Sequence, residues 1–166
     1  MNMDTSTRSS IWLDEEFEYE PQGWDPNARH VLIAEDDREM CRLLADSLRE
    51  DGYEVMEASD GQHLRDYIDY LRGTIVNGRF FDVDIIVSDI RMPGASGLEV
   101  LRELRRYDRE TPVILITAFG DDQTHAEAYR LGASAIIDKP FDIDGFRAFI
   151  RQLVPPSSDD LPRRAY

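Results

Sequence analysis

Hydrophobic and polar positions alternate in blocks along most of the chain, and these blocks predict five strands that alternate with five helices. Three apolar runs at residues 30–34, 83–88 and 113–117 are rich in Val, Ile and Leu. Such runs are typical of strands that are buried on both faces. Residues 53–58 and 134–138 are the other two predicted strands.

A helix is predicted after each strand, because apolar residues recur there at helical spacing. We expect the first helix to end at Gly52 and the third to begin after Gly97. The segment from Arg72 to Asp82 is longer than a usual connection, and it either extends the second helix or forms a loop. The apolar positions of the five helices are Met40, Leu43, Leu44, Leu48; Leu64, Tyr67, Ile68, Leu71; Leu98, Leu101, Leu104; Ala126, Tyr129, Leu131; and Phe146, Phe149, Ile150, Leu153.

Five βα units with right-handed crossovers predict an α/β fold with a doubly wound, five-stranded parallel sheet. We expect the flavodoxin-like strand order 2-1-3-4-5. Sheets of this kind bind ligands beyond the carboxyl ends of their strands, near the point where the strand order reverses. Candidate chemistry is therefore sought at the residues that follow each strand.

Three regions are predicted along the chain. Residues 29–154 form the folded domain, and residues 155–166 form a C-terminal tail that opens with two prolines. Residues 1–28 hold seven acidic residues against the single base Arg8, with four aromatic residues interleaved. This acidic extension is predicted to be a mobile tail, and a docking segment remains the alternative.

Composition narrows the class of protein. The chain has 166 residues, of which 42% are hydrophobic and 32% charged. Its first residues show no basic region followed by an apolar stretch and no apolar run is long enough for a membrane span, so we expect neither a secreted nor a membrane protein. Cys41 is its only cysteine, as expected in a reducing, cytoplasmic compartment. A net charge of −15 repels nucleic acid, so the expected partners are proteins and cations rather than nucleic acid or membrane.

Polar side chains follow four of the predicted strands. Glu35 and Asp36 follow the first strand, Asp89 follows the third, Thr117 ends the fourth and Lys139 follows the fifth. Each residue alone has an ordinary structural explanation, such as an aspartate that caps a helix. Parallel strands, however, bring all five residues to one edge of the sheet.

Carboxylates that converge repel one another unless a cation lies between them. Oxygen ligands with room for water suit Mg²⁺ better than zinc, and the three histidines have no metal-ligand spacing. Lys139 is the only lysine among 19 basic residues, which suggests a role for a compact ammonium group. The set is suited to stabilising a phosphoryl group that passes to a carboxylate.

The sequences LIAEDD, IIVSDIRMPGASG, PVILITAFG and GASAIIDKPFD resemble the receiver domains of bacterial two-component response regulators, and the nitrogen-regulation type in particular. The resemblance covers residues 30–154. It implies that Asp89 accepts a phosphoryl group from the phosphohistidine of a sensor histidine kinase or phosphotransfer protein. It also implies a signalling phosphoacceptor that assists only its own phosphorylation and dephosphorylation, and not an enzyme with another substrate.

The resemblance also implies the remaining roles. Asp36 and Asp89, with the main-chain carbonyl of Arg91, would bind Mg²⁺ or Mn²⁺, and Glu35 would act through water or as a second acidic ligand. Thr117 would hydrogen-bond the phosphoryl oxygens. Lys139 would pair with the same oxygens, and its peptide bond to Pro140 would be cis.

Two features depart from common receivers. The switch position three before the lysine, often aromatic, is Ile136, so the loop from Ala118 to Asp122 is expected to carry more of the change that starts at Thr117. Arg91 and Phe119 occupy positions that influence hydrolysis of the phosphoryl group in this family. Their bulk is expected to hinder the attacking water and to lengthen the signal.

Other functions are weighed against this one. A haloacid-dehalogenase-type phosphatase needs an acid where this chain has Arg91, and a flavodoxin-like FMN protein could not place a phosphate beside EDDRE. A receiver-like interaction module that works without phosphorylation remains the alternative. We expect a single-domain regulator without a fused output domain, which signals through an unknown output protein or as a homodimer through its fourth helix, fifth strand and fifth helix.

Overall fold

The computed structural model describes residues 25, 27–76, 79–80 and 83–157. Most of the predicted acidic extension and part of the predicted C-terminal tail lie outside these residues. Within the described ranges, no helix combines the length and the apolar character that crossing a membrane requires.

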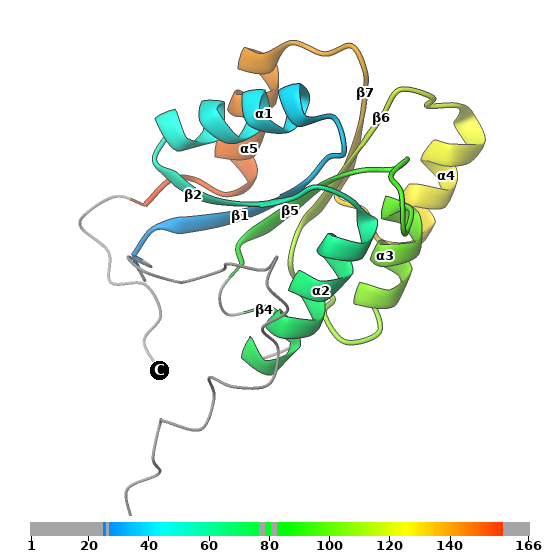
Figure 1. Cartoon of the computed structure of the whole chain (residues 1–166), viewed down its shortest axis with the longest axis horizontal. Coiled ribbons are helices and arrows are strands. Elements are labelled where there is room, and N and C mark those ends of the chain that lie inside the picture. The colour runs from blue at the N-terminus through cyan, green and yellow to red at the C-terminus, as the bar shows by residue number, and fades with distance from the viewer. Residues whose placement is uncertain (1–24, 26, 77–78, 81–82, 158–166) are drawn as a thin grey trace, which may run out of the picture.

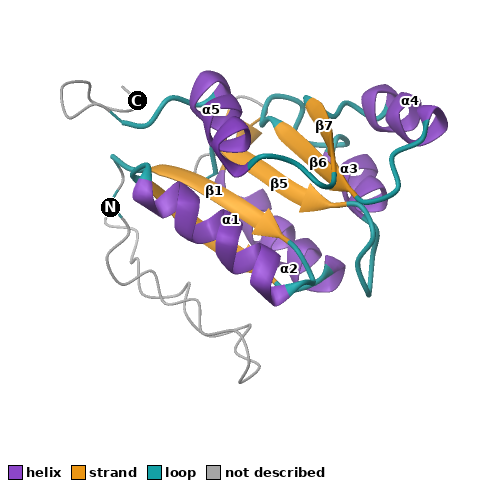
Figure 2. Ribbon diagram, turned by 90° about the horizontal axis from the view of Figure 1, so that it is seen from above, coloured by secondary structure: helices purple, strands orange, loops and turns teal. Residues whose placement is uncertain are grey.

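Five parallel strands form the central sheet (Figures 1 and 2). Their order is β2-β1-β5-β6-β7, which confirms the predicted order 2-1-3-4-5 of the doubly wound fold. The strands span β1 Arg29–Ala34, β2 Tyr53–Ala58, β5 Ile85–Asp89, β6 Val113–Thr117 and β7 Ala135–Asp138. Because all five run in the same direction, their carboxyl ends lie along one edge of the sheet.

Helices cover both faces of this sheet (Figure 1). The helices are α1 Arg38–Glu50, α2 Gly61–Leu71, α3 Gly97–Leu104, α4 Asp122–Arg130 and α5 Ile143–Leu153. Leu44 of α1 and Ile150 of α5 pack in one buried cluster with Ile33 of β1. Leu64 of α2 and Leu101 of α3 pack in a second cluster on the other face. Burial on both sides explains why the central strands are almost continuously apolar.

The segment between α2 and β5 differs from both structures that were considered for it. After a 3₁₀ turn at Arg72–Thr74, strands β3 Ile75–Val76 and β4 Arg79–Phe80 pair antiparallel as a short hairpin. The sequence contains a signal for this, because Asn77–Gly78 is a dipeptide favoured in two-residue hairpin turns. Neither alternative alone fits the described residues, because the helix is continued only by the 3₁₀ turn and a hairpin follows it.

Helix α4 is present where it was predicted, and of its three predicted apolar positions Leu131 packs against the core whereas the other two do not. Ala126 and Tyr129 are exposed, and the buried residue of the helix is Ala128. A nine-residue helix offers few positions from which to fix a stripe, and a small alanine can be the residue that packs closest. Tyr129 thus contributes an exposed aromatic ring to the outer surface of α4.

Candidate functional site

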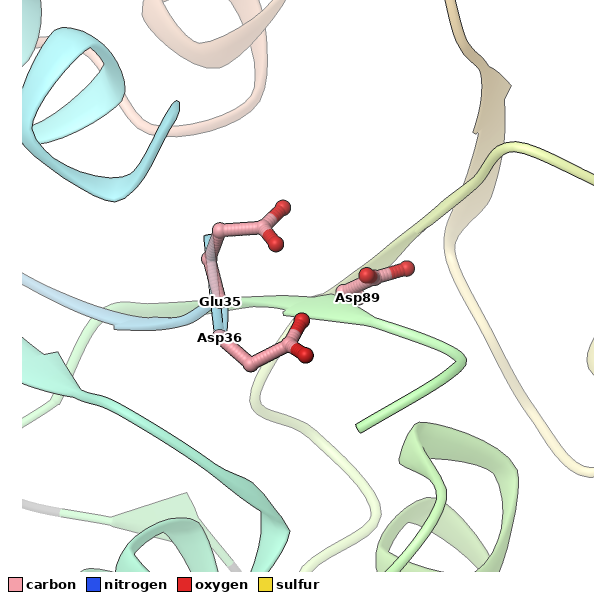
Figure 3. A group of neighbouring side chains, drawn as sticks. All are labelled: Glu35, Asp36 and Asp89. Atoms are coloured by element: carbon pink, nitrogen blue, oxygen red, sulfur yellow. The ribbon is translucent and has the colours of Figure 1, made fainter. Parts of the chain in front are cut away.

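Three carboxylates meet where β1 and β5 end (Figure 3). Glu35 and Asp36 directly follow β1, and Asp89 is the last residue of β5. One carboxylate oxygen from each residue lies within 4.8 Å of the other two. Glu35 and Asp89 are buried, whereas Asp36 is exposed. The structure thus brings together the three acidic side chains that the sequence placed at this edge.

The adjacent aspartates Asp36 and Asp37 have different surroundings. Asp37 caps α1, because its Oδ1 accepts hydrogen bonds from the backbone N–H of Glu39 and of Met40 at 2.9 and 3.1 Å. The backbone N–H of Asp37 donates to Glu35 Oε1 at 3.1 Å. Asp36 is therefore the member of the pair whose carboxylate joins the cluster.

Lys139 brings the positive charge to this cluster from the end of β7. Its Nζ lies 2.8 Å from Glu35 Oε2 and 3.5 Å from Asp89 Oδ2. Its backbone N–H donates to the carbonyl oxygen of Thr117 at 2.7 Å, which fixes the start of the loop against β6. The Lys139–Pro140 peptide bond is cis, as the resemblance implied.

Burial and neighbouring charges have opposite effects on the pKa values of Glu35 and Lys139. Burial raises the pKa of Glu35 above its ordinary value, and the hydrogen bond from Lys139 only partly offsets this. For Lys139, burial alone lowers the pKa, but the hydrogen bond to Glu35 and the charge of Asp89 outweigh it and raise the pKa. Lys139 is therefore a cation at neutral pH, held between two carboxylates.

Thr117 and Ile136 occupy the neighbouring strands. Thr117 is buried at the end of β6, and its Oγ1 accepts a hydrogen bond from the backbone N–H of Phe119 at 3.1 Å. Ile136 pairs with Leu115 in the sheet and is half-buried against the cluster beneath α3 and α4. Both residues lie where the sequence placed them, and their assignment as a switch stays a prediction.

Arg91 makes a contact that the sequence did not reveal. Its backbone N–H points at Asp89 Oδ1 over 3.4 Å, and its guanidinium carbon lies 4.2 Å from the centre of the Phe119 ring. Both side chains line a surface groove of about 620 Å³ that also includes Thr117 and Leu98. Sequence spacing identified the two positions separately but carried no signal that they touch.

Gly97, the first residue of α3, allows this helix to start close to the cluster. A Cβ atom at this position would lie 2.4 Å from the main-chain oxygen of Asp89 and 3.0 Å from Ser88 Oγ. Such distances leave no room for a side chain, so glycine is required for this close approach. The backbone of Asp89 is thus held between β6 and the start of α3.

The donor set fits a hard divalent cation. All three side chains offer carboxylate oxygens, and the exposure of Asp36 leaves one side of the cluster open to water and to further ligands. The ammonium group of Lys139 adjoins two of these carboxylates, those of Glu35 and Asp89. A nucleophilic carboxylate, an amine and a place for a cation at one strand edge are the parts that phosphoryl transfer requires.

Comparison with known proteins gives a consistent result. A family model described as the response regulator receiver domain matches residues 31–151. The regulatory protein AtoC of Escherichia coli (strain K12) is 32% identical over 127 residues, which are 74% of this chain and 24% of that protein. The sporulation initiation phosphotransferase F of Bacillus subtilis (strain 168) is 29% identical over 129 residues, which are 78% of this chain and 96% of that protein.

The chain covers less than half of several relatives, such as 49% of the transcriptional regulatory protein YkoG of Bacillus subtilis (strain 168). Among solved structures, the response regulator TrrA of Thermotoga maritima in complex with Mg²⁺ and BeF matches with a TM-score of 0.62 and 27% identity. This match covers 76% of the present chain and 99% of TrrA. The family match, the strand order and these structural neighbours agree, and the chain belongs to the response regulator receiver domains of two-component systems.

Proposed function

We propose that Asp89 accepts a phosphoryl group from the phosphohistidine of a sensor kinase or a phosphotransfer protein. The observation that carries this proposal is the joint position of the Glu35, Asp36 and Asp89 carboxylates, two of which, those of Glu35 and Asp89, contact the amine of Lys139. Three acids at such short range are unfavourable for folding alone, because like charges repel. The repulsion between these carboxylates is explained if the cluster serves to bind a cation and a phosphoryl group.

The transfer forms one bond and breaks one. An oxygen of the Asp89 carboxylate attacks the phosphorus atom, and the P–N bond of the phosphohistidine breaks. The electron pair of that bond stays with the imidazole nitrogen, which takes up a proton. The product is an acyl phosphate on Asp89. Its formation requires that Asp89 be ionised and lie in line with the leaving nitrogen.

Lys139 and Thr117 stabilise the arriving group. The Lys139 ammonium already contacts the Asp89 carboxylate. It can therefore pair with an oxygen of a phosphoryl group that is bound to this carboxylate. The Thr117 hydroxyl lies on the adjacent strand and donates to another oxygen. Both groups place positive charge or a donor where negative charge accumulates in the transition state.

Mg²⁺ is the proposed cofactor, with Mn²⁺ as a substitute. Asp36 and Asp89 would hold it with the main-chain carbonyl of Arg91, and Glu35, the third carboxylate of the cluster, would contribute through water or directly. When bound, it neutralises the carboxylates and the phosphoryl oxygens. TrrA, which shares the fold, was solved with Mg²⁺ and BeF, and this supports the choice of metal.

Output through protein contacts is part of the proposal. The edge strand β7 has no fully buried residue, and Tyr129 of α4 beside it is 54% exposed. This surface formed by α4, β7 and α5 is the proposed route to an output protein, with a homodimer as one form of it. The cytoplasmic location and the single-domain organisation stay predictions.

Intact-mass measurement tests phosphorylation directly. Incubation with acetyl phosphate and Mg²⁺ should add the mass of one phosphoryl group to the wild type, and EDTA should abolish the gain. Asp89→Asn should gain nothing, whereas the control Asp69→Asn, an exposed aspartate on α2, should behave as the wild type. An unchanged mass of the wild type with every donor would favour a module that works without phosphorylation.

A further inference from the structure

Arg91 is a second cation beside the proposed phosphorylation site. Lys139 is already paired with Glu35 and Asp89. Among the residues that the structure describes, the guanidinium of Arg91 takes part in no ion pair, and its recorded contact is the Phe119 ring. The site therefore contains one positive group that is engaged and one whose charge is not neutralised.

The backbone places Arg91 within reach of a group on Asp89. Residue 91 lies two positions after Asp89, and its backbone N–H is 3.4 Å from Asp89 Oδ1. The Arg91 side chain leaves from this point and lies along the groove that it shares with Thr117 and Phe119. Since the side chain starts this close to Asp89, rotation about its side-chain bonds is the movement that would turn the guanidinium from the ring toward Asp89.

Two contacts position Phe119, one through its ring and one through its backbone. Its ring accepts the Arg91 guanidinium at 4.2 Å, and its backbone N–H donates to Thr117 Oγ1 at 3.1 Å. The ring is otherwise mostly uncovered, with 61% of the residue exposed. The position of this ring therefore depends on the positions of the Arg91 guanidinium and the Thr117 hydroxyl.

A phosphoryl group on Asp89 changes the preference of Arg91. It adds one to two negative charges and strong acceptor oxygens, which the planar guanidinium can bind through two parallel N–H groups. A cation–π contact at an exposed site is weaker than such charge-assisted hydrogen bonds. The competition for Arg91 thus favours the phosphoryl oxygens once they are present.

We propose that the Arg91 guanidinium leaves the Phe119 ring on phosphorylation and binds the phosphoryl oxygens, which releases Phe119 as the aromatic reporter of the signal. This inference rests on the proposed function, because it needs a phosphoryl group on Asp89. It gives the side chain of Arg91 a binding role in addition to the one proposed for its carbonyl. It also supplies an aromatic switch in a chain whose switch position holds Ile136.

A fluorescent reporter tests this exchange. In a background with Trp12→Phe and Trp24→Phe, the substitution Phe119→Trp places the only indole of the chain on the loop. Beryllofluoride with Mg²⁺ serves as the phosphoryl mimic, and bound fluoride is followed independently by ¹⁹F NMR. We expect the mimic to increase quenching of the indole by acrylamide. In the further variant Arg91→Gln, quenching should be high from the start and should not change.

The affinity for the mimic gives a second readout. Arg91→Gln should weaken beryllofluoride binding by about tenfold, the size expected for a lost charge-assisted hydrogen bond. Arg102→Gln, on the exposed side of α3, is the matched control and should bind as the parent does. Bound fluoride with an unchanged indole, or equal affinity in Arg91→Gln, overturns this inference and leaves the proposed function standing. Absence of bound fluoride in the parent contradicts both.

Discussion

Asp36 is a residue whose charge is expected to oppose stability and to support function. It lies within reach of Glu35 and Asp89, and these three carboxylates repel one another without a cation. Asp36→Asn should therefore raise the free energy of unfolding by about 0.5–1 kcal/mol in EDTA, which is the size of exposed charge-pair effects. Urea unfolding in EDTA and in Mg²⁺ measures this change.

The same substitution should remove most of the extra stability that Mg²⁺ gives the wild type, because a ligand stabilises the folded state only as far as it binds. Asp46→Asn, on the exposed side of α1, is the control and should keep the full effect of Mg²⁺. If Asp36→Asn were destabilising in EDTA, the acidic cluster would not be a site of repulsion.

Arg91 and Phe119 are expected to lengthen the lifetime of the acyl phosphate. The two side chains are in contact beside Asp89 before phosphorylation. If Arg91 then moves to the phosphoryl group and releases Phe119, the Arg91 side chain supplies most of the shielding of the acyl phosphate. The double variant Arg91→Asn, Phe119→Ala should admit water and lose its phosphoryl group faster than the parent. Loss of the added mass with time, after removal of acetyl phosphate, gives the two rates. Equal rates would contradict the shielding role.

At the scale of elements, Asp51 joins the end of α1 to α5. Its carboxylate accepts two hydrogen bonds from Arg147, at 2.6 and 3.0 Å, and contacts Arg151 at 2.9 Å. The hydrogen bonds from Arg147 hold the pKa of Asp51 below its ordinary value of 3.8. A lowered pKa in the folded state means that the contribution to stability is present above pH 3.8 and is lost as the pH falls through the folded pKa.

Asp51→Asn should thus lower the free energy of unfolding at neutral pH. We expect about 1–2 kcal/mol, toward the low end for charge-assisted hydrogen bonds because Arg151 is partly exposed. The deficit should shrink as the pH falls below 4 and the parent loses the same interaction. Urea unfolding from pH 7 to pH 3 checks this, and a deficit that does not depend on pH would mean that packing rather than charge joins α1 to α5.

Gly120 controls the contact between α4 and β7. His125 Nε2 of α4 lies 2.9 Å from Asp138 Oδ1 of β7. A Cβ atom on Gly120 would lie 1.7 Å from that carboxylate oxygen and 2.6 Å from Nε2. Gly120→Ala should therefore displace these two partly exposed side chains and separate the pair, which should cost about 0.5–1 kcal/mol of stability and speed hydrogen exchange in α4.

Gly73→Ala is the matched control for this substitution, because an added Cβ there meets nothing within 4 Å. This substitution should change the free energy of unfolding by no more than about 0.5 kcal/mol. Similar effects of the two substitutions would show that the close approach at Gly120 does not constrain α4.

Local patterns predicted most elements, and their failures have local causes. Continuous apolar runs located the buried strands because both faces of the sheet are covered. Two of the three apolar positions predicted for α4 were wrong, because the buried residue of the helix is the small Ala128 and the larger Tyr129 lies outside. The β3–β4 hairpin was missed although Asn77–Gly78 pointed to a turn.

At the scale of the whole molecule, the parallel sheet explains why the site could be located from the sequence. Residues far apart in sequence, such as Glu35, Asp89 and Lys139, come together because each follows a parallel strand. Contacts between side chains that no strand register fixes were not predictable in this way. The Arg91–Phe119 contact and the Asp51–Arg147 pair are of this second kind.

The hairpin β3–β4 follows α2 and precedes β5, so it lies at the edge where the strands begin and away from the acidic cluster (Figure 1). An insertion there lengthens the connection without changing the positions of the strand ends that form the site. The fold therefore tolerates this addition at the edge opposite to its proposed chemistry.

The most direct test of the central claim identifies the carboxylate that carries the phosphoryl group. Borohydride reduces an aspartyl phosphate to homoserine, and peptide mass spectrometry then locates the altered residue. After phosphorylation with Mg²⁺ and borohydride treatment, we predict homoserine at position 89 and at no other aspartate. Homoserine at another aspartate such as position 36, or at none while the intact mass shows phosphorylation, would contradict the account.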